Sequence, residues 1–106
     1  MDGEGWGSHA TIWAMGKLTP TQRMLILKAI ADPRRMEIVE RLRAQEQCTA
    51  CSDLREVLPI SAATLSHHLK ELETAGLIAI AREGKYARLS FQRELWAAFL
   101  GDLGQI

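Results

Sequence analysis

Residues 59–77 read PISAATLSHHLKELETAGL, and this stretch decides the fold. Pro59 prevents a preceding helix from continuing, and Ser61 is a residue type that caps a new helix by accepting backbone N–H bonds. Leucines at i, i+4 and i+7 form one apolar stripe, and Gly76 follows where a left-handed turn ends a helix. The pattern predicts an amphipathic helix over residues 62–75. The leucines of the stripe are Leu65, Leu69 and Leu72.

The face of this predicted helix opposite the leucines carries small, hydroxylic and basic side chains. At about 100° per residue, the residues on this face are Ala63, His67, Lys70 and Thr74, with Ser66 and Glu71 at its margins. Such a face suits the major groove of DNA, because small residues allow close approach and hydroxyl or ammonium groups bond bases and phosphates. An ordinary solvated surface is the alternative for this helix alone.

Composition allows one small domain. The chain has 106 residues, 47% of them hydrophobic, and a formal net charge of zero, so it has no global basic field. No apolar run approaches the roughly 18–20 residues of a membrane span, and the start of the chain lacks the pattern of a secretory signal. Two cysteines close in sequence do not form a disulfide framework, so we expect a cytoplasmic protein.

The rest of the chain predicts a mainly α fold with a small β-hairpin: about five helices and a two-stranded wing. Thr19-Pro20 and Asp32-Pro33 each place a capping residue before a proline, which favours helix starts. Residues 1–17 are expected to be a flexible segment and residues 18–106 the folded domain. The other predicted helices cover residues 22–31, 33–44, 53–58 and 93–103, and the predicted strands cover 77–82 and 86–91.

A helix-turn-helix and a wing follow from this order. The short helix over 53–58 is joined to the helix over 62–75 by a tight turn. Glu83-Gly84-Lys85 separates the two strand-like runs as a hairpin tip. From residue 61 to residue 88 there are four Lys or Arg against three Glu, so the local basic excess is slight.

Two features of the outer helices point to partners. Arg34 and Arg35 lie in the first turn of a helix, where positive charge is unfavourable to the helix dipole. A phosphate would compensate that charge, and an ordinary surface pair is the alternative. The last helix has one broad apolar face, which we interpret as a dimer interface formed with residues 22–31. Packing within one chain is the alternative. The predicted interface residues are Leu25, Trp96, Phe99, Leu100 and Leu103.

Taken together, these pieces resemble the ArsR/SmtB winged-helix repressors. The shared motifs are Ala-Asp-Pro-Arg-Arg-x-x-Ile at 31–38, Ser-x-x-x-Leu-Ser-x-His-Leu-x-x-Leu at 61–72, Ala-Gly-Leu-Ile at 75–78 and Arg-x-Gly-Lys at 82–85. The resemblance covers about residues 20–104. It implies a homodimeric repressor that binds double-stranded operator DNA, with recognition helices about one DNA turn, roughly 34 Å, apart.

The resemblance assigns DNA contacts to the recognition helix and the wing. His68 matches the family's histidine before leucine and falls at the edge of the leucine stripe, so we predict a structural role for it. The predicted DNA-binding residues are Ser61, Thr64, Ser66, His67, Lys70, Arg82, Lys85 and Arg88.

Some members of that family bind arsenite or soft metals through a cysteine pair near this helix-turn-helix. Cys48 and Cys51 lie close to that place, but with Cys-x-x-Cys spacing instead of Cys-x-Cys. Two thiolates fall short of a three- or four-ligand site, so His9, Glu46 or a partner subunit would complete it. A reversible dithiol/disulfide switch and no sensing role are the alternatives. The family's other site has no match, because residues 93–103 contain no histidine.

Two other functions compete with DNA binding as interpretations of the sequence. An enzyme is not expected, because Cys-x-x-Cys redox chemistry needs a βαβ setting and the chain has no Gly-rich phosphate loop. A winged helix that binds protein instead of DNA is compatible with zero net charge. Salt dependence separates the two, since DNA binding weakens steeply as salt rises.

Overall fold

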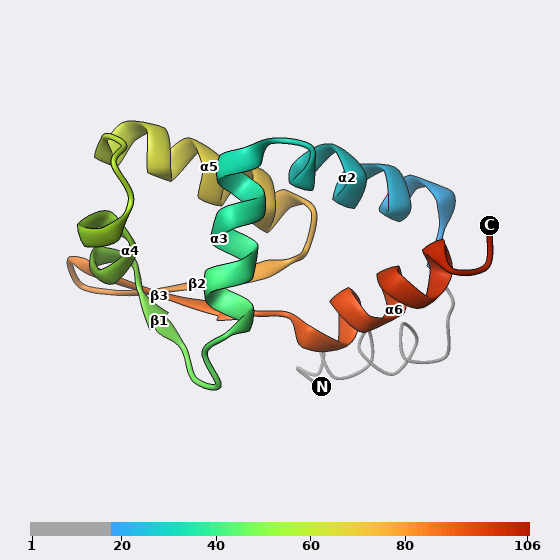
Figure 1. The fold of residues 1–106 in the computed structure, drawn as a ribbon. Coiled ribbons are helices and arrows are strands. Elements are labelled where there is room, and N and C mark those ends of the chain that lie inside the picture. Colours follow the sequence, from blue (N-terminus) through green and yellow to red (C-terminus); the bar gives the residue numbers. More distant parts are fainter. Residues whose placement is uncertain (1–17) are drawn as a thin grey trace.

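The computed structural model describes residues 18–106, which form five helices and three short strands (Figure 1). The predicted flexible segment over residues 1–17, including His9, lies outside the described residues. The prediction of a mainly helical winged helix-turn-helix is confirmed within the described range. The elements are α2 (Pro20–Ile30), α3 (Pro33–Arg43), β1 (Thr49–Ala50), α4 (Cys51–Val57), α5 (Ala62–Thr74), β2 (Ile78–Glu83), β3 (Tyr86–Phe91) and α6 (Arg93–Leu103).

Side chains at the predicted starts do cap three of the helices. Thr19, Asp32 and Ser61 each accept a hydrogen bond from the backbone N–H three residues later. Prolines follow the first two caps, where the missing N–H costs nothing. After α5 the chain turns at Gly76, whose φ of 84° lies in the left-handed region that favours glycine. Local chemistry therefore sets both ends of the recognition helix.

The strands form one antiparallel sheet in the order β1-β3-β2. The hairpin of β2 and β3 closes at Glu83, which pairs with Tyr86 across Gly84 and Lys85. The third strand is an addition to the predicted fold: Thr49 pairs with Leu89 in a stretch that we expected to be a plain connection. The prediction for α4 was also short, because the helix begins at Cys51 and not at residue 53.

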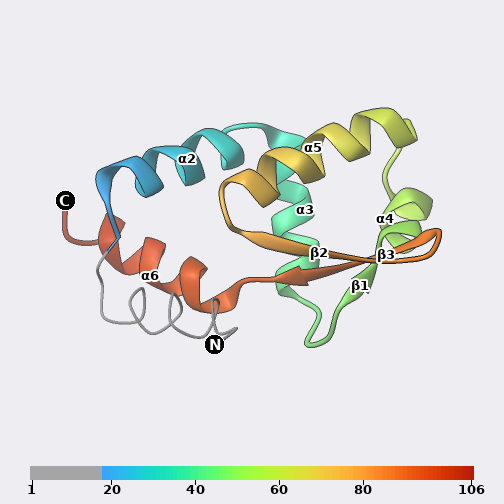
Figure 2. The ribbon, with the colours of Figure 1, turned by 180° about the vertical axis from the view of Figure 1, so that it is seen from behind.

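One hydrophobic core lies between the sheet and the five helices, which surround it (Figures 1 and 2). The leucine stripe of α5 is part of it, since Leu65, Leu69 and Leu72 are at most 4% exposed. The recognition helix is therefore held by its inner face and leaves its outer face free.

Within residues 18–106, no helix combines the length and apolar composition that a membrane crossing requires.

Helices α2 and α6 lie at the end of the molecule away from the wing (Figures 1 and 2). The guanidinium of Arg23 on α2 bonds the carboxylate of Asp102 on α6, with 2.5 Å between Nε and Oδ2. The predicted dimer residues separate into two groups here. Phe99 and Trp96 are 0% and 9% exposed and belong to the chain's own core, whereas Leu25 and Leu100 are 38% and 50% exposed.

Packing within one chain, the alternative reading, thus holds for the two aromatic residues. The rings of Phe99 and Trp96 pack against each other in a tilted arrangement, with 5.5 Å between their centroids. Leu103 is partly buried against the same core. The surface that α2 and α6 leave for a second subunit is aliphatic, and its most exposed side chains are Met24, Leu25 and Leu100. Dimerisation itself stays a prediction.

Candidate nucleic-acid interface

The outer face of α5 presents the predicted DNA-binding side chains to solvent. Ser61, Thr64, Ser66, His67 and Lys70 are all exposed. At the start of the helix, the Ser61 hydroxyl accepts the Thr64 backbone N–H at 3.1 Å and donates to the Thr64 hydroxyl at 3.0 Å. Two hydroxyls and the N–H groups of the first turn therefore lie close together, at a place where a phosphate oxygen could accept hydrogen bonds.

Lys70 lies one turn after Ser66 on the same face. Its ammonium is 3.7 Å from a carboxylate oxygen of Glu73, and its side chain is 73% exposed. An exposed pair with i,i+3 spacing contributes little energy and is screened by salt. The Lys70 ammonium is therefore available to a stronger anion such as a phosphate.

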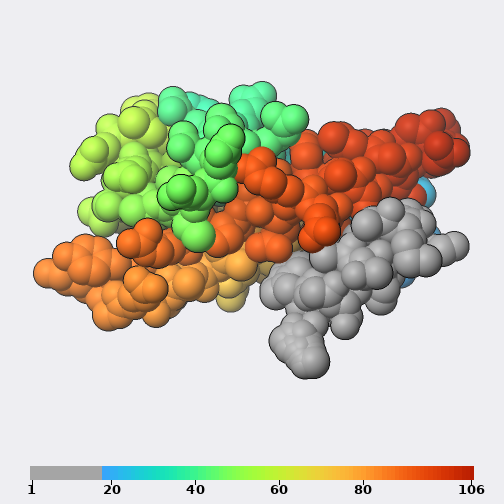
Figure 3. All heavy atoms as spheres, turned by 90° about the horizontal axis from the view of Figure 1, so that it is seen from below, coloured from blue at the N-terminus to red at the C-terminus, as the bar shows by residue number. Residues whose placement is uncertain are grey.

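The wing carries the remaining predicted contacts. Arg82, Lys85 and Arg88 are exposed, and Arg88 pairs loosely with Glu83 at 3.4 Å. The Lys85 ammonium lies 5.7 Å from the centroid of the Tyr86 ring, which is itself 64% exposed. The space-filling view from below shows the hairpin atoms (orange) as a projection at one end of the molecule (Figure 3). The wing tip thus combines cations with an aromatic side chain.

A shallow groove joins the helix to the wing. It has a volume of about 160 Å³, and its walls include Ser66 and Lys70 of α5 and Arg82 of β2. Cys51, the first residue of α4, also lines it. The recognition helix and the wing therefore meet at a groove with one cationic side chain on each side, Lys70 on the helix and Arg82 on the wing.

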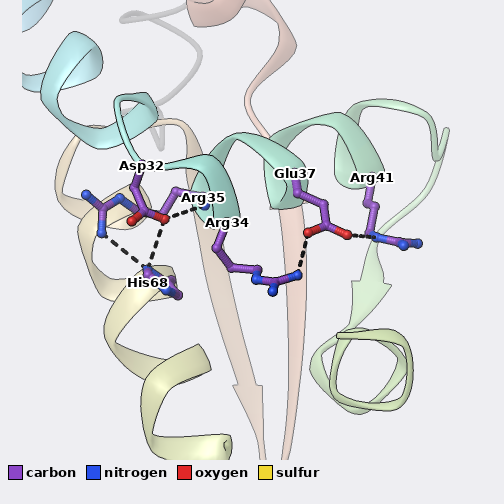
Figure 4. A network of polar contacts seen from close by, with 6 residues as sticks. All are labelled: Asp32, Arg34, Arg35, Glu37, Arg41 and His68. Carbon is purple, nitrogen blue, oxygen red and sulfur yellow. Dashed lines mark hydrogen bonds and ion pairs between the residues drawn. The ribbon is translucent and has the colours of Figure 1, made fainter. Parts of the chain in front are cut away.

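The cations at the start of α3 find partners inside the chain. Arg34 donates to Glu37 at 2.7 Å (Figure 4). The Arg35 Nε donates to the Ala29 carbonyl at 2.6 Å. Arg41 contacts the same Glu37 carboxylate at 3.4 Å. Arg34 is thus part of an ordinary surface ion pair, the alternative, whereas Arg35 contacts a backbone carbonyl of the chain itself. Compensation by a phosphate stays a prediction.

The two neighbouring histidines of α5 have different surroundings. His67 is exposed, as are the other side chains of α5 that are predicted to contact DNA. His68 is 12% exposed and lies against the start of α3, with its Nδ1 3.2 Å from the Arg35 Nη1 and 4.0 Å from an Asp32 oxygen (Figure 4). Burial lowers the pKa of His68, and the backbone N–H of Arg35 lowers the pKa of Asp32. His68 therefore contacts the protein interior and not the outer surface, in the position predicted for a structural residue.

The two cysteines contact different neighbours. Cys48 is exposed, with its sulfur 3.1 Å from the Ser90 hydroxyl on β3. Cys51 is partly buried against the core and lines the groove beside Ser66. Both are free thiols, and no group of three or more His, Cys, Asp or Glu side chains able to hold a metal occurs among residues 18–106. The arrangement of these two thiols does not fit a closed thiolate metal site within the described part of one subunit.

Fold and surface together define a winged helix-turn-helix protein, and comparisons with known proteins agree. A family described as "Helix-turn-helix domain" matches residues 30–81. The arsenical resistance operon repressor of Staphylococcus xylosus is 44% identical over 59 residues, covering 56% of this chain and 55% of the relative. The cadmium resistance transcriptional regulatory protein CadC homolog of Staphylococcus aureus is 30% identical over 80 residues, covering 76% and 65%.

A solved structure of an ArsR family transcriptional regulator has the same fold, with a TM-score of 0.73 at 24% identity, over 83% of this chain and 89% of that one. The chain belongs to the ArsR family of helix-turn-helix transcriptional regulators, as its motifs predicted, and not to a family of enzymes. It spans between about half and two thirds of the length of the curated relatives it matches.

The sequence did not identify two residues: Tyr86, which is exposed on the wing, and Arg35, which contacts α5 from the protein body. Tyr86 was assigned only to a strand, although its ring is exposed at the hairpin tip beside the Lys85 ammonium. Arg35 was considered only as a phosphate partner or as half of a surface pair, and its contact with His68 spans 33 positions of sequence. No local pattern reveals a contact of that separation.

Proposed function

We propose that the protein is a transcriptional repressor that binds double-stranded operator DNA as a homodimer. The observation that carries the proposal is the exposed polar face of α5, held in place by a fully buried leucine stripe. The repressor and regulatory names of its relatives support the same function. A cytoplasmic location follows from that function and from the free thiols.

The proposed contacts follow from the chemistry of each side chain. Ser66 and His67 lie where α5 would approach base edges, because both are exposed on a face without large apolar residues. Lys70 and Arg82 flank the groove between helix and wing and would neutralise phosphates on either side of it. Lys85 and Tyr86 at the wing tip would reach an adjacent part of the duplex.

Affinity for DNA from upstream of the protein's own gene tests this function. Fluorescence anisotropy at several salt concentrations should show affinity falling steeply as salt rises. Lys70→Ala should weaken binding to all sequences alike and reduce the salt slope by about 1. His67→Ala should weaken binding to the operator more than binding to unrelated DNA.

A matched control comes from a cation on another part of the surface. Arg43 is exposed at the end of α3 farthest from α5 (Figure 1), so Arg43→Ala should leave operator affinity unchanged. Wild-type affinity in Lys70→Ala would contradict the assignment of the phosphate-facing side. The absence of any specific, salt-dependent shift would favour the alternative, a winged helix that binds protein.

Dimerisation is proposed through the end of the molecule formed by α2 and α6. Exposed aliphatic side chains there, Leu25 and Leu100 among them, would be buried by a second copy. The Arg23–Asp102 pair fixes the two helices relative to each other. A small domain of this size also gains buried area from association.

A sensing role for the cysteines is a second candidate, and one observation favours it. Cys51 shares a groove with Ser66, Lys70 and Arg82, so a group bound to its sulfur would lie beside the proposed DNA contacts. Thiophilic ions and oxidants are the two effector classes that react with such thiols. Ion binding would need further ligands from a partner subunit or from residues outside the described range.

Operator affinity with and without arsenite, cadmium, zinc and peroxide separates these possibilities. Loss of affinity with an ion, absent in Cys51→Ser, supports ion sensing. Loss with peroxide, reversed by a thiol reductant and absent in Cys48→Ser, supports a disulfide switch. Unchanged affinity with every effector in the wild type leaves a regulator without cysteine-based sensing.

A further inference from the structure

Arg35 connects three parts of the fold that surround the start of α3. Its backbone N–H donates to the Asp32 carboxylate at 3.0 Å, and its Nε donates to the Ala29 carbonyl at the end of α2 at 2.6 Å. Its Nη1 lies 3.2 Å from Nδ1 of His68 on α5 (Figure 4). The only side chain that α5 contributes to this network is His68, so this contact ties the recognition helix to α2 and α3 through polar groups.

The contact requires one protonation state of the imidazole. A guanidinium only donates hydrogen bonds and stays charged, so Nδ1 of His68 must accept. The imidazole proton then resides on Nε2, and the ring is neutral. The Asp32 oxygen at 4.0 Å is too far from Nδ1 for a hydrogen bond. Protonation of Nδ1 would replace the Arg35 bond with repulsion and draw the ring toward Asp32.

The charges around the ring oppose each other. Asp32 favours the protonated imidazole, whereas Arg35, Arg34 and the neighbouring His67 disfavour it. Burial is the largest influence and also favours the neutral ring, so the pKa of His68 lies below its usual 6.5. The neutral, hydrogen-bond-accepting form is therefore the one present at neutral pH.

We propose that His68 is a positioning residue for DNA recognition: its neutral ring, held by Arg35, sets the orientation of α5 on the protein body. The inference rests on the proposed binding of operator DNA by α5. His67 is adjacent to His68 on the helix, so a small rotation of the His68 anchor moves the DNA-facing side chains. Protonation of His68 releases the anchor and weakens operator binding, while the leucine stripe keeps the helix folded.

Two substitutions separate the hydrogen bond from the bulk of the side chain. His68→Asn offers Oδ1 as an acceptor at nearly the place of Nδ1 and does not titrate between about pH 5 and 8. His68→Leu fills a similar space and has no acceptor. Both are placed in a His67→Gln parent, so that His68 is the sole histidine of α5 in the comparison.

Operator affinity is measured for the parent and both variants between pH 7.5 and 5.5. At pH 7.5, His68→Leu should weaken binding by about tenfold, the effect of losing one hydrogen bond to a charged group. His68→Asn should stay within about threefold of the parent. The parent should lose affinity as pH falls through the lowered pKa of His68, and His68→Asn should not. Parent-like affinity in His68→Leu, or an equal pH dependence in His68→Asn, would overturn the proposal.

A measurement without DNA separates this proposal from the proposed function. Amide hydrogen exchange of α5 should accelerate in His68→Leu, but not in His68→Asn, and nitrogen NMR should detect the Nε2–H tautomer of His68 in the wild type. If the His67→Gln parent and wild type both fail to bind DNA while these results hold, the proposed function fails and the anchor stands. An Nδ1–H tautomer at neutral pH would refute the anchor whatever the DNA result.

Discussion

Replacing Ser61 tests two roles of one side chain at the start of α5: the helix cap and the proposed contact with DNA. Its hydroxyl accepts the Thr64 backbone N–H at 3.1 Å and is exposed to solvent. Loss of such a cap costs between about 0.5 and 2 kcal/mol, and an exposed site belongs in the middle of that range. Ser61→Ala should therefore lower the free energy of unfolding by about 1 kcal/mol, or shift Tm by about 4–8 °C for a domain of this size.

Ser61→Asp separates stability from binding. Aspartate caps a helix as well as serine does, and its charge interacts favourably with the helix dipole. The variant should match or slightly exceed the wild type in thermal unfolding at equal protein concentration. Its carboxylate would stand beside a DNA phosphate, however, so operator affinity should fall by about tenfold or more, with the largest loss at low salt.

The two variants test the helix cap and the DNA contact separately. Urea or thermal unfolding monitored by circular dichroism measures the cap, and anisotropy with labelled operator measures the interface. A Ser61→Ala protein as stable as the wild type would show that the hydroxyl does not cap α5 in solution. Full operator affinity in Ser61→Asp would show that the start of α5 does not face the phosphates.

Three further outcomes follow from the packing and the ion pairs. Leu72→Ala removes a side chain that is 0% exposed, so urea unfolding should show a loss of about 2–5 kcal/mol; an exposed control, Ser66→Ala, should show almost none. Leu100→Glu should convert the proposed dimer to a folded monomer in sedimentation velocity, and a wild-type monomer at the same concentration would contradict the interface. The hydrogen bond from Arg23 lowers the pKa of Asp102 below 3.8. Its stabilisation is therefore complete above that pH and lost as pH falls through the lowered pKa, and the acid part of the stability curve should be flatter in Asp102→Asn.

Features encoded within a few residues were predictable from the sequence. The caps at Thr19, Asp32 and Ser61 are formed because a side-chain oxygen reaches a backbone N–H only three positions away. The leucine stripe of α5 was predictable for the same reason, since helical periodicity alone places it on one face. The hairpin tip needed only Gly84, whose φ of 62° suits the turn between β2 and β3.

Features that depend on distant partners were not predictable. The strand β1 has two residues, too few for any alternating pattern, and exists because Thr49 and Ala50 pair with β3 almost 40 positions later. The same pairing brings Cys48 to Ser90 and directs Cys51 into the groove beside α5. A Cys-x-x-Cys spacing suggests two sulfurs near one centre, but a strand between them gives each sulfur a different neighbour.

The apolar face of α6 shows a second limit of prediction from the sequence. Its residues recur on one side of the helix, and that pattern is the same whether the face meets its own core or another subunit. Only the packing distinguishes them: Phe99 is completely buried within the chain, and Leu100, the next residue, is half exposed. The aromatic residues that suggested a dimer are therefore core residues. The proposed dimer interface rests instead on the exposed aliphatic side chains beside them.

The two histidines of α5 show that a helical wheel predicts which face a residue occupies but not which residue it contacts. A helical wheel assigns His67 to the outer face and His68 to the margin of the leucine stripe, and their exposure agrees. The wheel cannot say what the marginal residue meets, because Arg35 belongs to another helix. That contact is what turns a generic structural histidine into a proposed anchor of defined protonation state. In this proposal His68, which does not contact DNA, sets how the neighbouring His67 meets the duplex.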